Sequence, residues 1–386
     1  MRKKLKDVCM FYSGTGFPIQ YQGQTKGEYP FYKVGDIANN AIAGKIYLEL
    51  CNNYISSDVA KMIKGCILPK DTVVFAKIGE ALKLNRRAIT SCDCLIDNNA
   101  MGIAPKLDFL RIQYFYFCMK NLKMQTLAES TTVPSVRKTV LEKYEIEVPS
   151  LVEQEEIEKK LTLTQKIIEK RRQELSYLDE IIKARFVEMF GDPRSNPFGF
   201  EKKRLKDTCK VITGNTPSRA IEEYYGDYIE WIKTDNIVSG ILNPTQATES
   251  LSEKGMNVGR TVEKDSILMA CIAGSIASIG RVCITDRTVA FNQQINAVVP
   301  EQYNILFLYV LFQMSKDYLV EDINMALKGI LSKSKLEEKE FIIPPMDLQE
   351  QFSDFVKQVD KSKVAVQKAL DETQMLFDSL MQEYFG

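Results

Sequence analysis

The sequence predicts an α+β protein in which two mixed α/β domains follow one another along the chain, each followed by a long helix. Three observations lead to this prediction. Two stretches of about 40 residues contain neither glycine nor proline and carry apolar residues at helical spacing. The segments outside them mix short β-like runs with loops. Framework residues recur along the chain at an offset of about 195–200 residues, which indicates a tandem repeat.

The first domain is expected to cover residues 1–149. Residues 29–34 and 71–76 are rich in β-branched and aromatic side chains and are typical of strands. The aromatic stretch 110–127 indicates a buried helix, and the alternation in 141–149 predicts a last strand.

A long helix, a central spacer, is predicted for residues 150–191. Pro149 precedes it, and Gly191 with Pro193 ends it, as expected of helix boundaries. Its apolar residues follow a near-heptad pattern, which is typical of a helix with a coiled-coil-like face. The residues expected to pair with another helix are Ile157, Leu161, Ile168, Leu175, Leu178 and Ile182.

The plan then restarts. Residues 192–200 are dense in Gly, Pro, Asn and Ser and predict a linker at the start of a second domain, residues 192–346. A second spacer helix is expected for residues 347–386, and it opens with Glu350-Gln351 as the first opens with Glu153-Gln154. Its expected pairing residues are Phe355, Val359, Val366, Leu376 and Leu380.

Short framework matches support a duplication. Residues 4–7 (KLKD) correspond to 204–207 (RLKD), and 70–73 (KDTV) correspond to 264–267 (KDSI). Ser13-Gly14-Thr15 matches Thr213-Gly214-Asn215. The chain is therefore expected to contain two copies of one unit, a domain followed by a helix.

Charge is divided unequally between the copies. Lys+Arg and Asp+Glu are both 51, so the net charge is zero. Residues 1–150 nevertheless carry 21 basic and 14 acidic side chains, whereas residues 191–346 carry 18 and 20. The first domain is thus modestly basic, and the second needs a local basic patch to bind nucleic acid.

The nine cysteines have no framework spacing, and there is no histidine, so we expect reduced thiols in the cytoplasm and no metal site. The basic start MRKKLKD has no apolar stretch after it and is not expected to be a signal peptide, and no apolar run is long enough to span a membrane.

Catalytic motifs are missing. The sequence has no GxxxxGK[ST] phosphate loop and no Asn/Asp-Pro-Pro-Tyr/Phe motif, and Asn196-Pro197-Phe198 lacks the second proline. Without histidine, Ser-His and Cys-His nucleophile pairs are excluded. This favours a binding protein with no catalytic residue and no cofactor of its own.

Polar loops with basic residues are the candidates for DNA contact, because arginine suits bidentate contact with guanine or phosphate and small residues allow close backbone approach. For each of them the alternative is a solvated surface side chain, and for the asparagines a turn cap. The candidates are Lys33, Lys77, Lys83, Asn85, Arg86 and Arg87 in the first domain, and Thr213, Asn215, Lys233, Thr234, Asn236, Ser275, Ser278 and Arg281 in the second.

Several short motifs are spread over the whole chain in the order domain, helix, domain, helix. They are Pro149, Glu153-Gln154 and Ile157, Phe190-Gly191-Asp192-Pro193 and Asn196-Pro197, residues 214–218 (GNTPS), residues 231–235 (WIKTD), and Glu350-Gln351. Through these motifs the chain resembles the specificity subunits of type I restriction–modification systems. The first domain departs from the pattern, because residues 13–18 (SGTGFP) are a degraded version of 214–217 (GNTP).

The resemblance implies that the two α/β segments are target recognition domains, each reading one half of a split, asymmetric DNA sequence. The long helices would pack antiparallel as a coiled coil and bind two modification subunits. S-adenosylmethionine and adenine methylation would belong to those subunits, and restriction subunits would join for ATP- and Mg-dependent cleavage.

Two other readings stay open at this point. A fragment of a fused restriction–methylation enzyme would supply catalysis itself, which the missing Pro-Pro-Tyr/Phe motif disfavours. A coiled-coil scaffold without a DNA role would show no salt-dependent DNA binding together with a modification subunit.

Overall fold

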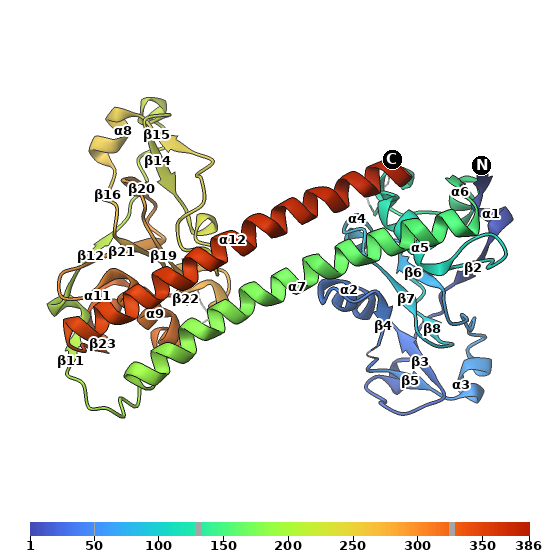
Figure 1. Ribbon diagram of the computed structural model, residues 1–386, viewed down its shortest axis with the longest axis horizontal. Helices are drawn as coiled ribbons and strands as arrows, with labels where there is room; N and C mark the ends of the chain where they lie inside the picture. Colours follow the sequence, from blue (N-terminus) through green and yellow to red (C-terminus); the bar gives the residue numbers. More distant parts are fainter. Residues whose placement is uncertain (50, 129–132, 324–328) are drawn as a thin grey trace. The chain divides into compact units, whose positions relative to one another are not determined.

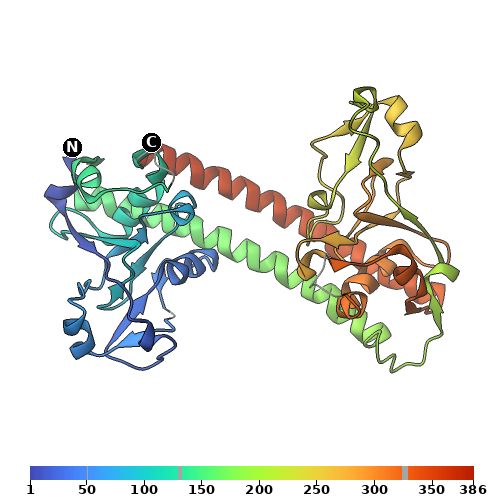
Figure 2. The same ribbon diagram turned by 180° about the vertical axis from the view of Figure 1, so that it is seen from behind.

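The computed structural model describes residues 1–49, 51–128, 133–323 and 329–386. The chain divides into two compact units: unit 1 contains Met1–Arg172 and Lys368–Gly386, and unit 2 contains Gln173–Gln367. The long helices α7 (Leu151–Phe190) and α12 (Met346–Phe385) each contribute one half to each unit (Figure 1 and, from behind, Figure 2). The compact units therefore differ from the predicted division into domains and spacer helices, which remains a prediction.

Unit 1 is built on a five-stranded sheet of order β2-β9-β6-β7-β4, in which only the β4–β7 pairing is parallel. A three-stranded sheet of order β5-β3-β8 accompanies it. The strands are β2 (Cys9–Ser13), β3 (Tyr29–Tyr32), β4 (Tyr47–Leu48), β5 (Tyr54–Ile55), β6 (Val73–Ala76), β7 (Arg87–Thr90), β8 (Leu95–Ile96) and β9 (Ala100–Pro105).

The helices of unit 1 are short, apart from the halves of α7 and α12. The aromatic α5 is buried, as its sequence predicts, and forms part of the hydrophobic core beside the first half of α7. The last strand predicted for residues 141–149 is shorter in the structure. Its first residues belong to α6, and the strand β10 (Glu145–Glu147), which pairs with β1 (Arg2–Lys4), begins only after that helix. The helices are α1 (Leu5–Val8), α2 (Val34–Ile42), α3 (Ser57–Met62), α4 (Glu80–Lys83), α5 (Ile112–Asn121) and α6 (Lys138–Lys143).

Unit 2 repeats this plan with a four-stranded sheet of order β12-β21-β17-β19 and a five-stranded sheet of order β13-β15-β14-β20-β16. Two-stranded pairs β11–β23 and β18–β22 complete it. The strands are β11 (Lys202–Arg204), β12 (Cys209–Thr213), β13 (Tyr225–Gly226), β14 (Ile229–Ile232), β15 (Ser250–Leu251), β16 (Thr261–Val262), β17 (Ile267–Ala270), β18 (Ile272–Ala273), β19 (Val282–Ile284), β20 (Val289–Phe291), β21 (Ile295–Pro300), β22 (Gly329–Ile330) and β23 (Glu340–Ile342), and the helices are α8 (Glu253–Val258), α9 (Ile305–Met314), α10 (Lys316–Val320) and α11 (Lys333–Glu338).

The strand register confirms that the two halves are copies. Cys9 of β2 pairs with Pro105 of β9, and Cys209 of β12 pairs with Pro300 of β21. The glycine after each of these edge strands allows the same close approach: a Cβ on Gly14 would lie 1.8 Å from the Asp97 carbonyl oxygen, and one on Gly214 would lie 2.2 Å from that of Asn292. Both copies therefore require glycine at this position for the same steric reason.

A buried glutamine fastens each copy to its long helix. Gln154 of α7 is fully buried, donates to the carbonyls of Phe109 and Pro149 at 2.8 and 2.9 Å, and accepts from the Arg111 amide at 2.9 Å. The Phe109 and Arg111 groups lie just before α5 and the Pro149 carbonyl lies just before α7, and burying them without partners would be costly.

The matching residue in the second copy is Gln349. It accepts from the Asn304 amide at 2.9 Å and donates to the Pro344 carbonyl at 2.8 Å, whereas Gln351 is exposed. Gln154 therefore corresponds to Gln349, two residues before the Gln351 that the sequence match of Glu153-Gln154 with Glu350-Gln351 predicts. Glutamine stands on both sides of Glu350, and only burial distinguishes the two.

Most residues predicted for helix pairing lie in the cores of their own units. Leu161 and Ile168 share a core with Phe377 and Met381 in unit 1, and Ile182 shares one with Val359 in unit 2.

The prediction for Leu376 is wrong. Its side chain is 53% exposed, because its neighbour Phe377 turns inward and packs edge-on against Phe117, with ring centroids 6.2 Å apart. Within each unit a polar contact links the two long helices: Lys160 Nζ donates to Tyr384 Oη at 3.2 Å in unit 1, and Lys363 Nζ lies 2.7 Å from Asp179 Oδ1 in unit 2. In the part of the chain that the structure describes, no helix is long and apolar enough to cross a membrane.

Candidate nucleic-acid interface

The turn before β19 brings four of the predicted DNA-binding residues together. A short 3-10 helix (Ile276–Ser278) and Gly280, whose φ is 76°, lead into Arg281. The Arg281 guanidinium donates from Nε to the Ser278 carbonyl and from Nη2 to the Thr234 carbonyl, both at 3.2 Å. Ser275 Oγ lies 3.0 Å from Ser278 Oγ. Arg281 is thus held in place by its neighbours, and its remaining N–H groups have no acceptor among the described residues.

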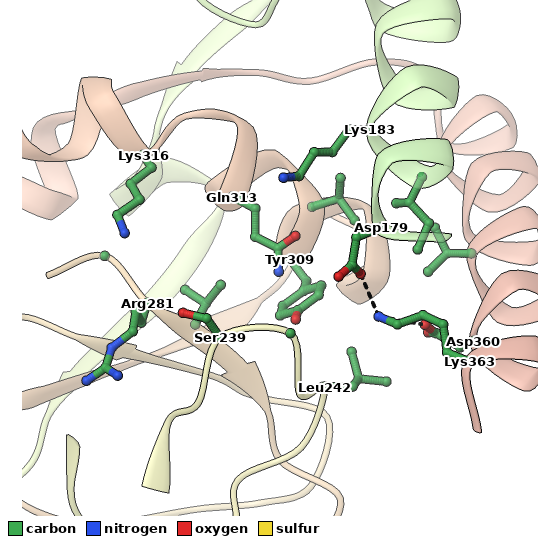
Figure 3. A pocket seen from close by; sticks show the side chains of 16 residues that line it. Asp179, Lys183, Ser239, Leu242, Arg281, Tyr309, Gln313, Lys316, Asp360 and Lys363 are labelled. Atoms are coloured by element: carbon green, nitrogen blue, oxygen red, sulfur yellow. Dashed lines mark hydrogen bonds and ion pairs between the residues drawn. The ribbon is translucent and has the colours of Figure 1, made fainter. Parts of the chain in front are cut away.

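Beside this turn lies an open cavity of about 380 Å³, which we call the mixed-charge pocket (Figure 3). Arg281, Lys183 and Lys316 bring positive charge to its lining, whereas Asp179 and Asp360 bring negative charge. Lys363 pairs with both carboxylates, at 2.7 and 3.9 Å. Burial raises the pKa of Asp360, Lys363 opposes the shift and Asp179 adds to it. Both carboxylates of this pocket are therefore engaged by Lys363, whereas Arg281, Lys183 and Lys316 form no ion pair among the described residues.

A second cluster stands at the end of β14. Lys233 Nζ and the Arg219 guanidinium both bond to Glu249, the latter at 2.7 Å, and lie over the Trp231 ring at 5.1 and 5.3 Å from its centroid. The hydrogen bond from Lys233 is the main cause that holds the pKa of Glu249 below its usual value. Arg219 and Glu249 were not predicted from the sequence. The position of Arg219 directly after residues 214–218 would have indicated that it lies near the predicted contacts.

Three polar residues predicted to bind DNA make hydrogen bonds inside the second domain. Thr213 Oγ1 bonds to Asn296 at 2.8 Å, and Asn215 Nδ2 donates to the Val258 carbonyl at 2.9 Å. Asn236 is buried and bonds to Thr245 and to the Gln246 carbonyl. For Asn236 this burial corrects the prediction, because its side chain fixes the loop after β14 and does not reach the surface.

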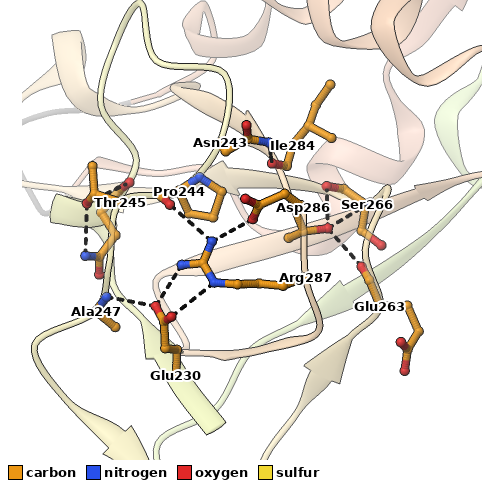
Figure 4. A network of polar contacts seen from close by, with 12 residues as sticks. Glu230, Asn243, Pro244, Thr245, Ala247, Glu263, Ser266, Ile284, Asp286 and Arg287 are labelled. Carbon is orange, nitrogen blue, oxygen red and sulfur yellow. Dashed lines mark hydrogen bonds and ion pairs between the residues drawn. The ribbon is translucent and has the colours of Figure 1, made fainter.

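An internal polar network braces the same loop (Figure 4). Arg287 makes a two-pronged contact with Glu230, at 3.1 and 2.7 Å, and bonds to Asp286 at 2.6 Å. Glu230 also accepts from the Ala247 amide at 2.9 Å. The hydrogen bond to Arg287 is the main cause that lowers the pKa of Glu230. The network connects β14 with the ends of β19 and β20 and so fixes the position of Thr234 and Lys233.

In the first copy the corresponding turn contains Asn85 and Arg86, and Arg87 is the first residue of β7. Arg87 is only 3% exposed, and its guanidinium donates to the Leu122 carbonyl at 2.6 Å and to the Asn85 side chain at 3.0 Å. Burial lowers its pKa to about 10, against the influence of Tyr116. Arg87 therefore cannot contact DNA directly, which corrects its prediction: the apparent Arg-Arg pair contains one interior residue. Asn85 is engaged by the same network.

The remaining candidates of the first domain are at least partly exposed. Lys33 Nζ bonds to Gln22 at 3.1 Å and lies 4.1 Å from the Phe17 ring centroid, as Lys233 lies over Trp231 in the second copy. Lys83 pairs with Glu80 at 2.6 Å. Lys77 is held through its backbone between Asn99 and Val136, and Arg86 lines a cavity with Lys120 and Arg172.

No cluster of three or more His, Cys, Asp or Glu side chains suited to a metal ion exists among the described residues. Burial raises the pKa of the Cys118 and Cys271 thiols to about 12, so these thiols are neutral.

The family model for the type I restriction modification DNA specificity domain matches residues 1–177 and again residues 197–373. The chain therefore belongs to this family and contains the domain twice. It is 24% identical over 409 residues to the MjaIX type I restriction enzyme specificity subunit of Methanocaldococcus jannaschii, covering 98% of this chain and 91% of that protein. It is also 35% identical over 117 residues to the HindI specificity subunit of Haemophilus influenzae, covering 30% of this chain and 24% of that protein.

Two solved structures share the fold along the whole chain. The S subunit of a type I restriction–modification system from M. genitalium has a TM-score of 0.57 and 13% identity, covering 100% of this chain and 96% of that one. A chain from a structure of complex assembly and conformational transition in the type I R-M system has a TM-score of 0.58 and 15% identity, covering 100% and 97%. The chain is thus a type I restriction–modification specificity subunit by family and by fold.

Proposed function

We propose that this specificity subunit reads a bipartite, asymmetric DNA target, each α/β domain recognising one half-sequence. The observation that carries the proposal is the double match of the DNA specificity domain, together with divergence between the copies at the turns before β7 and β19. Two copies of one fold with different side chains at the same turn suit two different half-sequences.

The proposed contacts in the second domain are Arg281 with Thr234, Ser275 and Ser278, joined by Lys233. Arg281 offers free guanidinium N–H groups from a fixed position, which suits a base edge or a phosphate. In the first domain the proposal keeps the residues with accessible side chains, which are Lys33, Lys77, Lys83 and Arg86. Thr213, Asn215 and Asn85 support these contacts from behind through their hydrogen bonds.

The long helices are proposed to pair antiparallel as a coiled coil and to dock two modification subunits, as the resemblance implies. The contacts between the two helices within each unit support the pairing. Both helices also carry exposed apolar side chains, which are typical of a surface that a partner covers. These include Val152, Leu163 and Tyr177 on α7, and Val364 and Met375 on α12.

Catalysis is assigned to the partners in this proposal. The modification subunits would supply S-adenosylmethionine and methylate adenine, and restriction subunits would add ATP- and Mg-dependent cleavage. The chain itself would select the sequence and hold the subunits together.

The test is to purify the chain alone and together with modification subunits of the same restriction–modification system, and to map adenine methylation on plasmid DNA. The proposal expects no methylation by the chain alone and methylation of one split sequence by the complex. Methyl transfer by the chain alone, or methylation without sequence preference by the complex, would contradict it.

A further inference from the structure

Unit 1 contains an open cavity of about 260 Å³ at the position that the mixed-charge pocket occupies in unit 2, and we call it the basic pocket. Both cavities lie between the turn before a sheet strand, the aromatic helix of the domain and the two long helices. The basic pocket is lined by Lys45, Arg86, Arg87, Lys120 and Arg172, by the single carboxylate Glu169, and by Ala41, Gly44, Asn85, Tyr116, Gln165, Ile168, Gln374 and Phe377.

The positive charge of this pocket is mostly uncompensated. Among the described residues, Arg86, Lys120 and Arg172 form no ion pair with a carboxylate, and only Lys45 does, with Glu49 at 2.5 Å. Glu169 is engaged by Gln165, whose Nε2 donates to it at 3.1 Å. Several cations facing one cavity repel one another, and an anion relieves that repulsion.

Two buried groups in the lining also lack partners. Arg87 is 3% exposed and has no carboxylate partner, and its Nε is buried without an acceptor. Gln165 Oε1 is likewise buried without a donor. Burial lowers the pKa of Lys120, Glu169 and Asp378 oppose this shift, and Arg172 and Arg87 add to it. Burial and the two nearby guanidinium groups thus disfavour the charged form of this lysine.

The mixed-charge pocket of unit 2 shows what the basic pocket lacks. When the two copies are aligned at the repeat offset, Asp360 of unit 2 corresponds to Gln165 of unit 1, and Asp179 of unit 2 corresponds to Gln374 of unit 1. Lys363, which pairs with both aspartates, corresponds to the apolar Ile168. The second copy thus sets two carboxylates against the four cations of its pocket, whereas the first sets one carboxylate against five cations.

We propose that the basic pocket binds a phosphate group through Arg86, Lys120 and Arg172, and that in the assembled complex this group is a backbone phosphate of the first DNA half-site. The inference deepens the proposed function and rests on it for the source of the phosphate. Guanidinium groups bind phosphate with paired, charge-assisted hydrogen bonds, and such a contact fixes register without reading a base.

The first arm of the test uses the isolated full chain and inorganic phosphate as the probe. Phosphate should raise the melting temperature of the wild-type chain more than chloride does at equal ionic strength, because a ligand bound to the folded state stabilises it. The Arg172→Gln variant should lose this difference. Because the Arg172 side chain is exposed, the substitution removes positive charge from the pocket without removing a buried side chain. Lys166→Gln removes an exposed charge from the same helix outside the pocket and should keep it.

The second arm measures DNA binding by the complex with modification subunits as a function of salt. Arg172→Gln should weaken binding about tenfold on all sequences and reduce the salt slope by about 1, whereas Lys166→Gln should change neither. Equal responses of the two variants in both arms would overturn the pocket as an anion site. A phosphate effect lost in Arg172→Gln without any change in salt slope would assign the pocket to free phosphate and overturn the DNA contact. A wild-type complex without sequence preference would instead overturn the proposed function, and with it the DNA source.

Discussion

The two copies agree where backbone groups are buried and disagree where side chains face a cavity. Thr90 Oγ1 accepts from the Thr72 amide at 2.9 Å, and Thr285 Oγ1 accepts from the Ser266 amide at the same distance. A few residues earlier, the interior Arg87 has no charged counterpart, because Val282 occupies the matching position. The repeated residues therefore hold the fold, and the divergent ones are free to define what each half binds.

The largest effect is expected at the buried glutamines. Gln154→Ala and Gln349→Ala each leave buried backbone groups without partners, at about 1–3 kcal/mol for each group. We expect a loss on the order of 3 kcal/mol, confined to unit 1 for Gln154 and to unit 2 for Gln349.

The chain offers a selective probe for this experiment. Its single tryptophan, Trp231, lies in unit 2, so urea unfolding followed by Trp231 fluorescence should shift for Gln349→Ala. Hydrogen exchange at α5 should increase for Gln154→Ala. The exposed Gln351→Ala is the control and should change neither signal, and equal effects of Gln349→Ala and Gln351→Ala would contradict the structural assignment.

The adjacent arginines of the first copy should separate stability from binding. Arg87→Met leaves the Leu122 carbonyl and Asn85 without their donor, so unit 1 should lose about 2 kcal/mol. Arg86→Gln should leave stability unchanged and weaken DNA binding by the complex. Thermal unfolding and DNA titration of both variants measure the two effects. A loss of stability in Arg86→Gln together with a loss of DNA binding alone in Arg87→Met would show that Arg87 reaches the surface in solution.

Arg281 should show a smaller effect, on binding alone. Two of its nitrogens bond to the protein itself, so we expect Arg281→Ala to cost about 1 kcal/mol of binding, the lower end for a specific arginine contact. The loss should fall on the second half-sequence, read by competition with single-base variants of the target. Arg260→Ala removes an exposed arginine elsewhere in the domain and serves as the control, and a loss that is uniform over all sequences would make Arg281 a phosphate contact.

The sequence predicted the repeat, both long helices and the buried aromatic α5, because glycine, proline and apolar spacing determine such elements locally. It could not tell Arg86 from Arg87, since adjacent residues at a strand start differ only in the direction that tertiary packing gives them. The sequence placed Leu376 among the helix-pairing residues for a related reason. Leu376 and Phe377 both fit the near-heptad pattern, but it is Phe377 that packs in the core of unit 1. The basic pocket could not be predicted because Arg86, Lys120 and Arg172, which are proposed to bind phosphate there, come from three separate parts of the chain.

The smallest expected effect tests whether the two pockets differ through charge alone. Asp360→Gln places in unit 2 the residue type that Gln165 supplies in unit 1, and Lys363 keeps Asp179 as its partner. The change removes a carboxylate whose pKa is raised by burial, so unit 2 should gain about 0.2–0.5 kcal/mol, the range for relieving a like-charge contact.

The sign can be checked by pH. The folded-state pKa of Asp360 is raised, so wild-type unit 2 should gain stability relative to Asp360→Gln as the pH falls through that pKa. The stability advantage of the variant should therefore be largest well above this pKa. Trp231 fluorescence during urea unfolding at two pH values measures this. The variant should also bind non-specific DNA slightly more tightly and with a steeper salt dependence, because its pocket then carries a larger excess of positive charge. Unchanged stability and unchanged salt dependence would mean that the carboxylate is fully solvated and that the pockets differ by shape, not by charge.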